Sequence, residues 1–163
     1  MTSFVKGALV ALSVAGGLSM AALSTPAFAE GFDVNVTSTD LALRGVDPVS
    51  YFTEGKPVQG DVEINAEHNG AVYRFASEAN KALFTADPEK YAPQFGGYCA
   101  FGLSKGFKFD GDPNVWKIVD DKLYVNLSPK VGELWKADTA NLITEAETQW
   151  TTIKDADPAS LNP

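Results

Sequence analysis

The fold is decided by the stretch His68-Asn69-Gly70-Ala71-Val72-Tyr73-Arg74-Phe75-Ala76-Ser77. Asn-Gly is the strongest short sequence indication of a two-residue hairpin turn, because both residues tolerate the positive φ that such turns need. Apolar and polar residues alternate over 62–68 and an apolar-rich run follows over 71–75, so we expect two antiparallel strands. Ser77 is a typical N-cap and predicts a helix that runs to about Phe84.

Similar patterns continue toward the C-terminus. Asp87-Pro88-Glu89 predicts a short helix that Pro93 and the following glycines end. The apolar run over 98–103 fits a buried strand or one to two helical turns, and we favour the helix. A second hairpin and two helices complete the pattern, with strands over 115–119 and 123–127 and helices that begin at Ser128 and at Asp138 or Thr139.

These elements predict a small single α+β domain with two antiparallel β-hairpins, several short helices and a C-terminal helix. Numerous aromatic residues supply enough apolar surface for a core without disulfides. No internal repeat, low-complexity tract or linker is evident. We therefore expect one domain over 30–154, followed by a flexible tail over 155–163.

The first 29 residues have the organisation of a cleaved signal peptide. Lys6 supplies the positive charge, an apolar run extends over 8–23, and small residues at Ala27 and Ala29 fit a signal peptidase. A transmembrane anchor is the alternative, but glycine and serine interrupt the run and leave it weakly apolar. We expect cleavage after Ala29, and a periplasmic or secreted product with no membrane span after processing.

The composition excludes several kinds of partner and site. The chain is acidic, with a formal net charge of −8, so its surface repels phosphate backbones and we expect no nucleic-acid partner. A single Cys excludes an internal disulfide, and a single His excludes a site with two imidazoles from one chain. The G-x-S-x-G, H-E-x-x-H and phosphate-loop motifs are absent, so we assign no catalytic residue.

Three motifs resemble the YHS domain family. They are Asp47-Pro48-Val49, the Asn69-Gly70 hairpin with its Tyr-x-Phe-x-Ser strand end, and Phe-x-Ala-Asp-Pro-Glu-Lys-Tyr over 84–91. The resemblance covers 47–91, and the extension over 96–153 is similar to that of extended secreted YHS proteins of proteobacteria, mostly known without an assigned activity. The family is related to TRASH-type metal-sensing modules, so the resemblance implies a small metal-associated fold.

The chain departs from the family at the positions that hold metal. Metal-binding members carry cysteine shortly after the Asp-Pro-Val motif, at the end of the return strand and one turn into the helix. This chain has Ser50, Ala76 and Asn80 at those places. Because the thiolates that would hold a soft metal are missing, the resemblance implies the fold without the family's metal ligands.

Cys99 is the centre of the candidate site. An unpaired thiol is unusual in an oxidising compartment, and a helix that starts just after Gly96-Gly97 would lower its pKa. The alternative is a small buried hydrophobe. His68 is either a ligand or a residue at the end of a turn. The candidate metal ligands are therefore Cys99, His68, Asp47 and Tyr98.

Three functions follow from these residues. We favour a periplasmic YHS-like binding protein that holds a metal ion, copper before other transition metals, or a small ligand around Cys99. The alternative is a non-catalytic scaffold that has lost the family's metal site and binds a protein partner in the periplasm. The weakest is a thiol-dependent redox protein, because it needs a depressed Cys99 pKa and an adjacent base.

Overall fold

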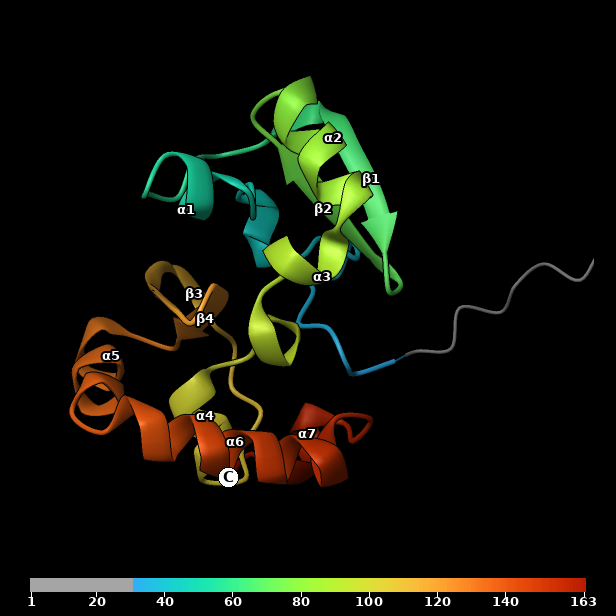
Figure 1. Ribbon diagram of the computed structural model, residues 1–163. Helices are drawn as coiled ribbons and strands as arrows, with labels where there is room; N and C mark the ends of the chain where they lie inside the picture. The colour runs from blue at the N-terminus through green and yellow to red at the C-terminus, as the bar shows by residue number, and fades with distance from the viewer. Residues whose placement is uncertain (1–30) are drawn as a thin grey trace, which may run out of the picture.

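The computed structural model describes residues 31–163, and the predicted signal peptide over 1–29 lies outside them. Two units lie one above the other in Figure 1, each with one two-stranded antiparallel sheet and covering helices. The fold is therefore α+β with two hairpins and a C-terminal helix, as the sequence predicts. None of the helices among the described residues is both long enough and apolar enough to span a bilayer.

The elements of the two units follow one another in the chain. The first unit contains η1 (Leu43–Gly45), α1 (Ser50–Thr53), β1 (Asp61–His68), β2 (Ala71–Phe75), α2 (Glu78–Ala86) and α3 (Pro88–Tyr91). The second unit contains η2 (Gln94–Gly97), α4 (Ala100–Ser104), β3 (Asp112–Val119), β4 (Lys122–Asn126), α5 (Pro129–Lys136), α6 (Thr139–Ile153) and α7 (Pro158–Leu161).

The first hairpin forms where the Asn-Gly pair predicts it. His68 pairs with Ala71 across the turn, and the turn residues Asn69 and Gly70 have φ values of 49° and 73°. The Ser77 hydroxyl accepts a hydrogen bond from the Asn80 N–H at 3.1 Å, and α2 begins directly after this cap. The helix expected over 98–103 is also confirmed, as α4.

The second hairpin repeats the first with a shift of 51 residues. The register slips after Asp61 in β1 and after Asp112 in β3. Each of these carboxylates accepts a hydrogen bond from the backbone N–H two residues later, at 2.9 Å from Glu63 and 2.8 Å from Asn114. The same irregularity, fixed by the same residue type, therefore occurs at the same place in both hairpins.

Each hairpin is followed by a serine-capped helix that carries an aromatic ring onto the hairpin. The ring centroids of Tyr73 and Phe84 are 4.8 Å apart in the first unit. Those of Tyr124 and Trp135 are 5.5 Å apart in the second unit, again 51 residues later. Ser128 caps α5 in the way that the equivalent serine caps α2.

The segment before each hairpin recurs as well, with a shift of 52 residues. Three consecutive residues with positive φ, over 43–45 and 95–97, lead the chain toward α1 and α4. The Asp47 N–H then donates to the Val58 carbonyl at 2.9 Å, and the Cys99 N–H donates to the Phe109 carbonyl at 2.8 Å. The described chain thus contains two copies of one structural unit.

This repeat corrects the expectation from the sequence that the chain has no internal repeat. The residues that recur are mainly those that set backbone geometry, at turns, caps and the irregular register. Core side chains differ between the copies, since Phe75 of the first corresponds to Asn126 of the second. Similar backbones with different core residues give little sequence similarity.

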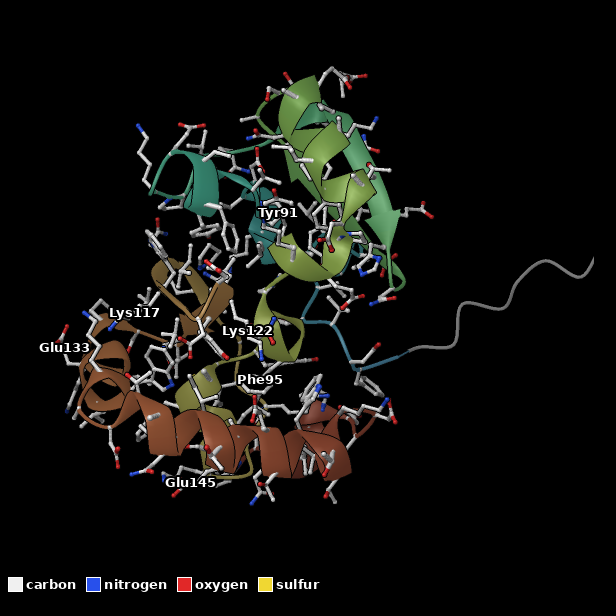
Figure 2. The ribbon with its side chains drawn as sticks, in the orientation of Figure 1. Tyr91, Phe95, Lys117, Lys122, Glu133 and Glu145 are labelled. Carbon is white, nitrogen blue, oxygen red and sulfur yellow. The ribbon has the colours of Figure 1, made fainter. Side chains whose placement is uncertain are left out.

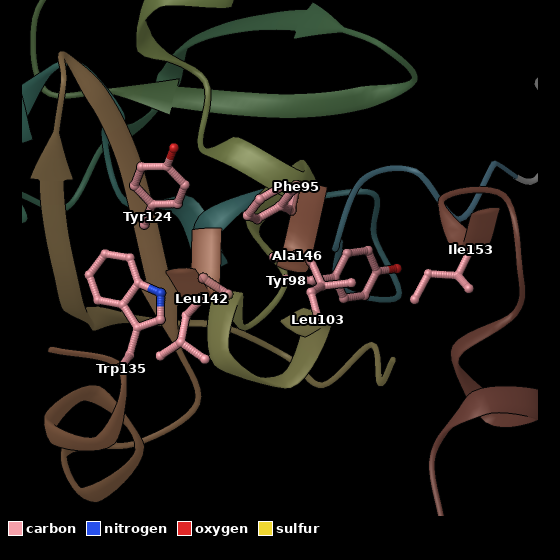
Figure 3. Packing of buried hydrophobic residues seen from close by; sticks show 9 residues of the cluster. Phe95, Tyr98, Leu103, Tyr124, Trp135, Leu142, Ala146 and Ile153 are labelled. Atoms are coloured by element: carbon pink, nitrogen blue, oxygen red, sulfur yellow. The ribbon is translucent and has the colours of Figure 1, made fainter. Parts of the chain in front are cut away.

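Three clusters of buried apolar residues hold the fold together. The first unit has its own cluster, with Tyr73 and Phe84 at its centre. The second unit has the cluster in Figure 3, where α6 covers Leu103 and Trp135. A third cluster lies between the units, where the Tyr51 hydroxyl donates to the Pro113 carbonyl at 2.8 Å. Burial raises the pKa of this phenol, because a phenolate would lose its hydration there.

Lys108 joins both ends of the described chain to the second unit. Only 1% of its surface is exposed, and its ammonium donates to the carbonyls of Phe32, Lys154 and Ala156. Two of these carbonyls follow α6, where unpaired carbonyls of a helix end favour a cation. Desolvation lowers the pKa of Lys108 to about 8, although Asp33 and other nearby carboxylates partly offset it.

The C-terminal residues correct the expectation of a flexible tail over 155–163. They form α7, and the Asn162 amide both accepts from the Lys108 N–H and donates to the Lys108 carbonyl, each at 3.0 Å. The pairing of the Asn162 amide with a buried segment 54 residues earlier is not visible in the composition of the tail. The sequence therefore indicated fraying.

We expect Lys108→Met to lower the free energy of unfolding by about 2 kcal/mol or more, because three buried carbonyls lose their donor. Lys105→Met is the matched control. It removes a half-exposed ion pair with Glu145, so its cost should stay within about 1 kcal/mol. Urea unfolding at pH 7 measures both, and equal losses for the two variants would contradict the anchoring role of Lys108.

The parent protein and Lys108→Met also allow a test of the Lys108 pKa through the pH dependence of stability. Because the pKa of Lys108 is about 8 in the fold and 10.5 ordinarily, the unfolded chain binds more protons between these values. The contribution of this lysine to stability should therefore rise with pH across that window. The difference in unfolding free energy between the parent and Lys108→Met should grow from pH 8 to pH 10, and a constant difference would exclude the shift.

Candidate functional site

Asp47 occupies the centre of the first unit. Its side chain is fully buried, and its two oxygens accept hydrogen bonds from the Val49 N–H at 2.8 Å, the Ala76 N–H at 2.8 Å and the Asn80 Nδ2 at 2.7 Å. The Ser50 hydroxyl donates to the Asp47 carbonyl at 2.7 Å. This carboxylate ties together α1, the end of β2 and the first turn of α2.

Ser50, Ala76 and Asn80 stand where metal-binding members of the family that this sequence resembles carry cysteine. The structure brings all three against Asp47. Their contacts here are hydrogen bonds to Asp47, through a hydroxyl, a backbone N–H and an amide. The arrangement is a satisfied buried hydrogen-bond network, in which the carboxylate has N–H donors in place of water.

Cys99 holds the equivalent place in the second unit. It is 1% exposed and caps α4, since its Sγ accepts a hydrogen bond from the Gly102 N–H at 3.3 Å. The Asn126 Oδ1 lies 3.7 Å from the same sulfur. Burial raises the pKa of the thiol, and this outweighs the lowering by backbone N–H groups, of which that of Gly102 is the largest. The start of a helix was expected to lower the pKa of Cys99, but burial at this position raises it and keeps the thiol protonated.

His68 lies at the end of β1, away from the Cys99 cap. Its Nε2 is 3.2 Å from the Glu89 Oε1, a distance typical of an ion pair, but the angle does not give a hydrogen bond. The imidazole packs edge-on to Phe84, with ring centroids 5.8 Å apart. One side of this ring is therefore part of the first unit's core, and a polar atom without a hydrogen-bond partner remains.

Tyr98 lies under the ammonium of Lys108, which is 4.5 Å from the ring centroid. Burial raises the pKa of its phenol to about 12, with Asp110 and Asp33 adding to the shift. This residue therefore belongs to the anchor of the chain ends, and its contacts are a cation–π pair and the ring of Trp150.

The four predicted ligands lie in separate surroundings. Asp47 contacts Asn80, Cys99 contacts Asn126, His68 contacts Glu89, and Tyr98 contacts Lys108. Within residues 31–163, no group of three or more His, Cys, Asp or Glu side chains is placed to hold a metal ion. Metal binding by these residues stays a prediction, without a shared site to support it.

A cleft of about 260 Å³ opens where the two units meet the ends of the described chain. The first unit contributes Tyr73 and Glu89 besides His68, and η2 contributes Phe95, which Figure 2 places where the two units face each other. Residues from both ends of the described chain also line it, namely Asp33, Val34, Trp150 and Lys154. Ligand sites occur preferentially at such junctions, although this cleft is smaller than most.

The sequence gives no sign of this cleft, apart from His68. Its walls come from segments that are more than a hundred residues apart, and no local motif marks Asp33 or Trp150 as neighbours of the hairpin. Trp150 has the spacing of a core position on a C-terminal helix, which is also correct, because its ring centroid is 6.0 Å from that of Phe95.

Comparison with known families supports the resemblance found in the sequence. Residues 49–95 match the family model of the YHS domain, so the first unit carries a YHS domain. The match ends at Phe95, inside η2, and leaves the second unit from α4 onward outside it. No curated protein and no solved structure matches the chain.

We expect Asp47→Asn to destabilise the protein by about 2–4 kcal/mol, because its new amide hydrogens would face the donors of Ala76 and Asn80. Asp121→Asn is the matched control at an exposed turn position with φ of 57°, which asparagine adopts readily, so little change is expected. Denaturant unfolding of both variants measures the difference. Comparable stability of the two would contradict the central role of Asp47.

We expect the Cys99 thiol of the folded protein to react with a thiol reagent at least tenfold more slowly than in the unfolded chain at pH 8, because it is buried and its pKa is raised. The rate in urea, on the same protein, is the control. Fast labelling in native buffer would show an accessible thiolate and revive the redox hypothesis.

Proposed function

We propose that this protein is a non-catalytic binding protein of the periplasm or secreted fraction, and that it holds a small organic molecule in the cleft between its units. The observation that carries the proposal is the convergence of His68, Glu89 and Asp33 with the rings of Phe95 and Trp150 around one opening. Polar groups that orient a ligand, beside aromatic walls that contact it, are the usual composition of small-molecule sites.

The geometry supports a small molecule better than a metal ion. Metal ligands must lie within about 2–2.6 Å of one ion, which requires side chains that converge on a point. Cys99, favoured as the anchor of a copper site, already has its sulfur engaged with the Gly102 N–H inside the second unit. The polar groups of the cleft are spread over its walls, which suits a ligand of several atoms.

A thiol-dependent activity receives no support from the site. Cys99 is buried with a raised pKa, and the histidine that could act as its base packs against Phe84 in the other unit. A nucleophilic thiol needs a lowered pKa and a base within hydrogen-bond reach.

A protein-binding scaffold is the second candidate, and one observation favours it. Leu83 on α2 and Leu134 on α5 occupy equivalent positions, 51 residues apart, and are 41% and 50% exposed. The fold thus presents the same apolar residue to solvent twice, on two related helices. Isolated exposed leucines are common, so the cleft carries the stronger argument.

The test is retention of a small molecule by the folded chain. The chain without its predicted signal peptide is incubated with a periplasmic small-molecule extract and freed of unbound solutes. Native mass spectrometry should then detect a bound species. Ala92→Trp places a large ring into the cleft and should abolish retention, whereas Ala79→Trp, at an exposed position of α2 outside the cleft, should not.

Elemental analysis of the same preparations separates the candidates. A retained organic species that Ala92→Trp removes supports the proposal. Stoichiometric copper that a Cys99→Ser variant loses would overturn it in favour of the metal site, and equal retention by parent and Ala92→Trp would place the ligand elsewhere. No retained species in any preparation would favour the scaffold.

A further inference from the structure

The charges around the cleft are mainly negative. Asp33 and Glu89 line it, Glu89 at the rim with 79% of its side chain exposed and Asp33 half-buried. The charges of both carboxylates act on the buried Tyr73 hydroxyl, since they add to the rise in its pKa that burial causes. Two carboxylates therefore face the same region of the cleft from the first unit and from the N-terminal segment.

The nearby cations do not cancel this charge. Lys108 points its ammonium at three backbone carbonyls, which use its three donors. Lys154 lines the cleft but is exposed, and Asp155 and Asp157 lie close enough to raise the pKa of Lys108. The local balance stays acidic, like the whole chain.

Three aromatic rings also line the cleft. Phe95 is 8% exposed and its ring meets that of Trp150 at 62°, with centroids 6.0 Å apart. Tyr73, 2% exposed, contributes the third ring. Aromatic faces attract cations through their quadrupole, and carboxylates add a direct charge interaction.

The His68 Nε2 adds a polar group to this site. It is buried and makes no hydrogen bond to any described residue, although Glu89 lies 3.2 Å away. The imidazole thus offers a ligand one polar atom that no described residue satisfies. Carboxylates, rings and one unpaired nitrogen together select a ligand that combines positive charge, N–H donors and apolar surface.

From these walls we infer that the cleft binds a small organic cation, a primary ammonium attached to an apolar or aromatic group. The inference rests on the proposed function, because it names the ligand class of the same cleft. The ammonium lies between Asp33 and Glu89, beside His68, and the apolar part contacts Phe95 and Trp150.

Benzylammonium is the probe, with benzyl alcohol and benzoate as neutral and anionic molecules that carry the same ring. Amide NMR shifts of the chain from residue 30 onward are followed during titration at pH 7 and low salt. We expect saturable shifts at Asn69 and Gly96, which line the cleft, with benzylammonium only. Added salt should weaken the binding, because the attraction is partly between exposed charges.

Asp33→Asn and Glu89→Gln should each raise the dissociation constant about fivefold, and the double variant by more. Glu63→Gln is the matched control, since Glu63 is an exposed acid on β1 outside the cleft, and it should leave the constant unchanged. Equal weakening by Glu63→Gln would reduce the effect to the overall charge of the protein and overturn the inference.

Failure of the inference can be told from failure of the proposed function. Binding of benzoate or benzyl alcohol as tight as that of benzylammonium would overturn the cation preference and keep the cleft as a ligand site. No saturable shift with any of the three, while Ala92→Trp still abolishes retention of a periplasmic molecule, would also overturn the cation class alone. If retention does not depend on the cleft either, both proposals fall.

Discussion

A two-stranded hairpin cannot stay folded alone in water, and this constraint governs the whole molecule. Each hairpin here is covered by the helix that follows it, and Tyr73 on Phe84 or Tyr124 on Trp135 supplies the contact. Both units are small, so they also depend on each other. Tyr51 closes the junction by packing on Trp116 and donating to a carbonyl of the second unit.

Local chemistry allowed much of this fold to be predicted. The Asn69-Gly70 turn, the Ser77 cap and the Ser128 cap are each decided by residues within a few positions of one another, and all three form as expected. The flexible tail was wrong because Asn162 is held by Lys108, which lies 54 residues earlier in the chain. The repeat was missed because its two copies share backbone geometry and differ in their cores.

The candidate site was predictable only in part, because it also depends on contacts between residues far apart in the chain. The resemblance singled out Ser50, Ala76 and Asn80 as the family's cysteine positions, and the structure shows that all three hydrogen-bond to Asp47. Proximity of Cys99 to His68 could not be judged from spacing, and their contacts lie in different units. The cleft brings together distant segments, and pairing of that kind leaves no periodicity or motif in one sequence.

The change from a 52-residue to a 51-residue shift locates the one difference in length between the two copies. Asp47 and Cys99 differ by 52, whereas their hydrogen-bond partners Val58 and Phe109 differ by 51, so the second copy is one residue shorter between these positions. The difference arises before α1 and α4 end, since their last residues, Thr53 and Ser104, are already 51 apart. Each hairpin then keeps the 51-residue shift throughout, because a slip of one residue in a strand would turn its inward side chains to the other face.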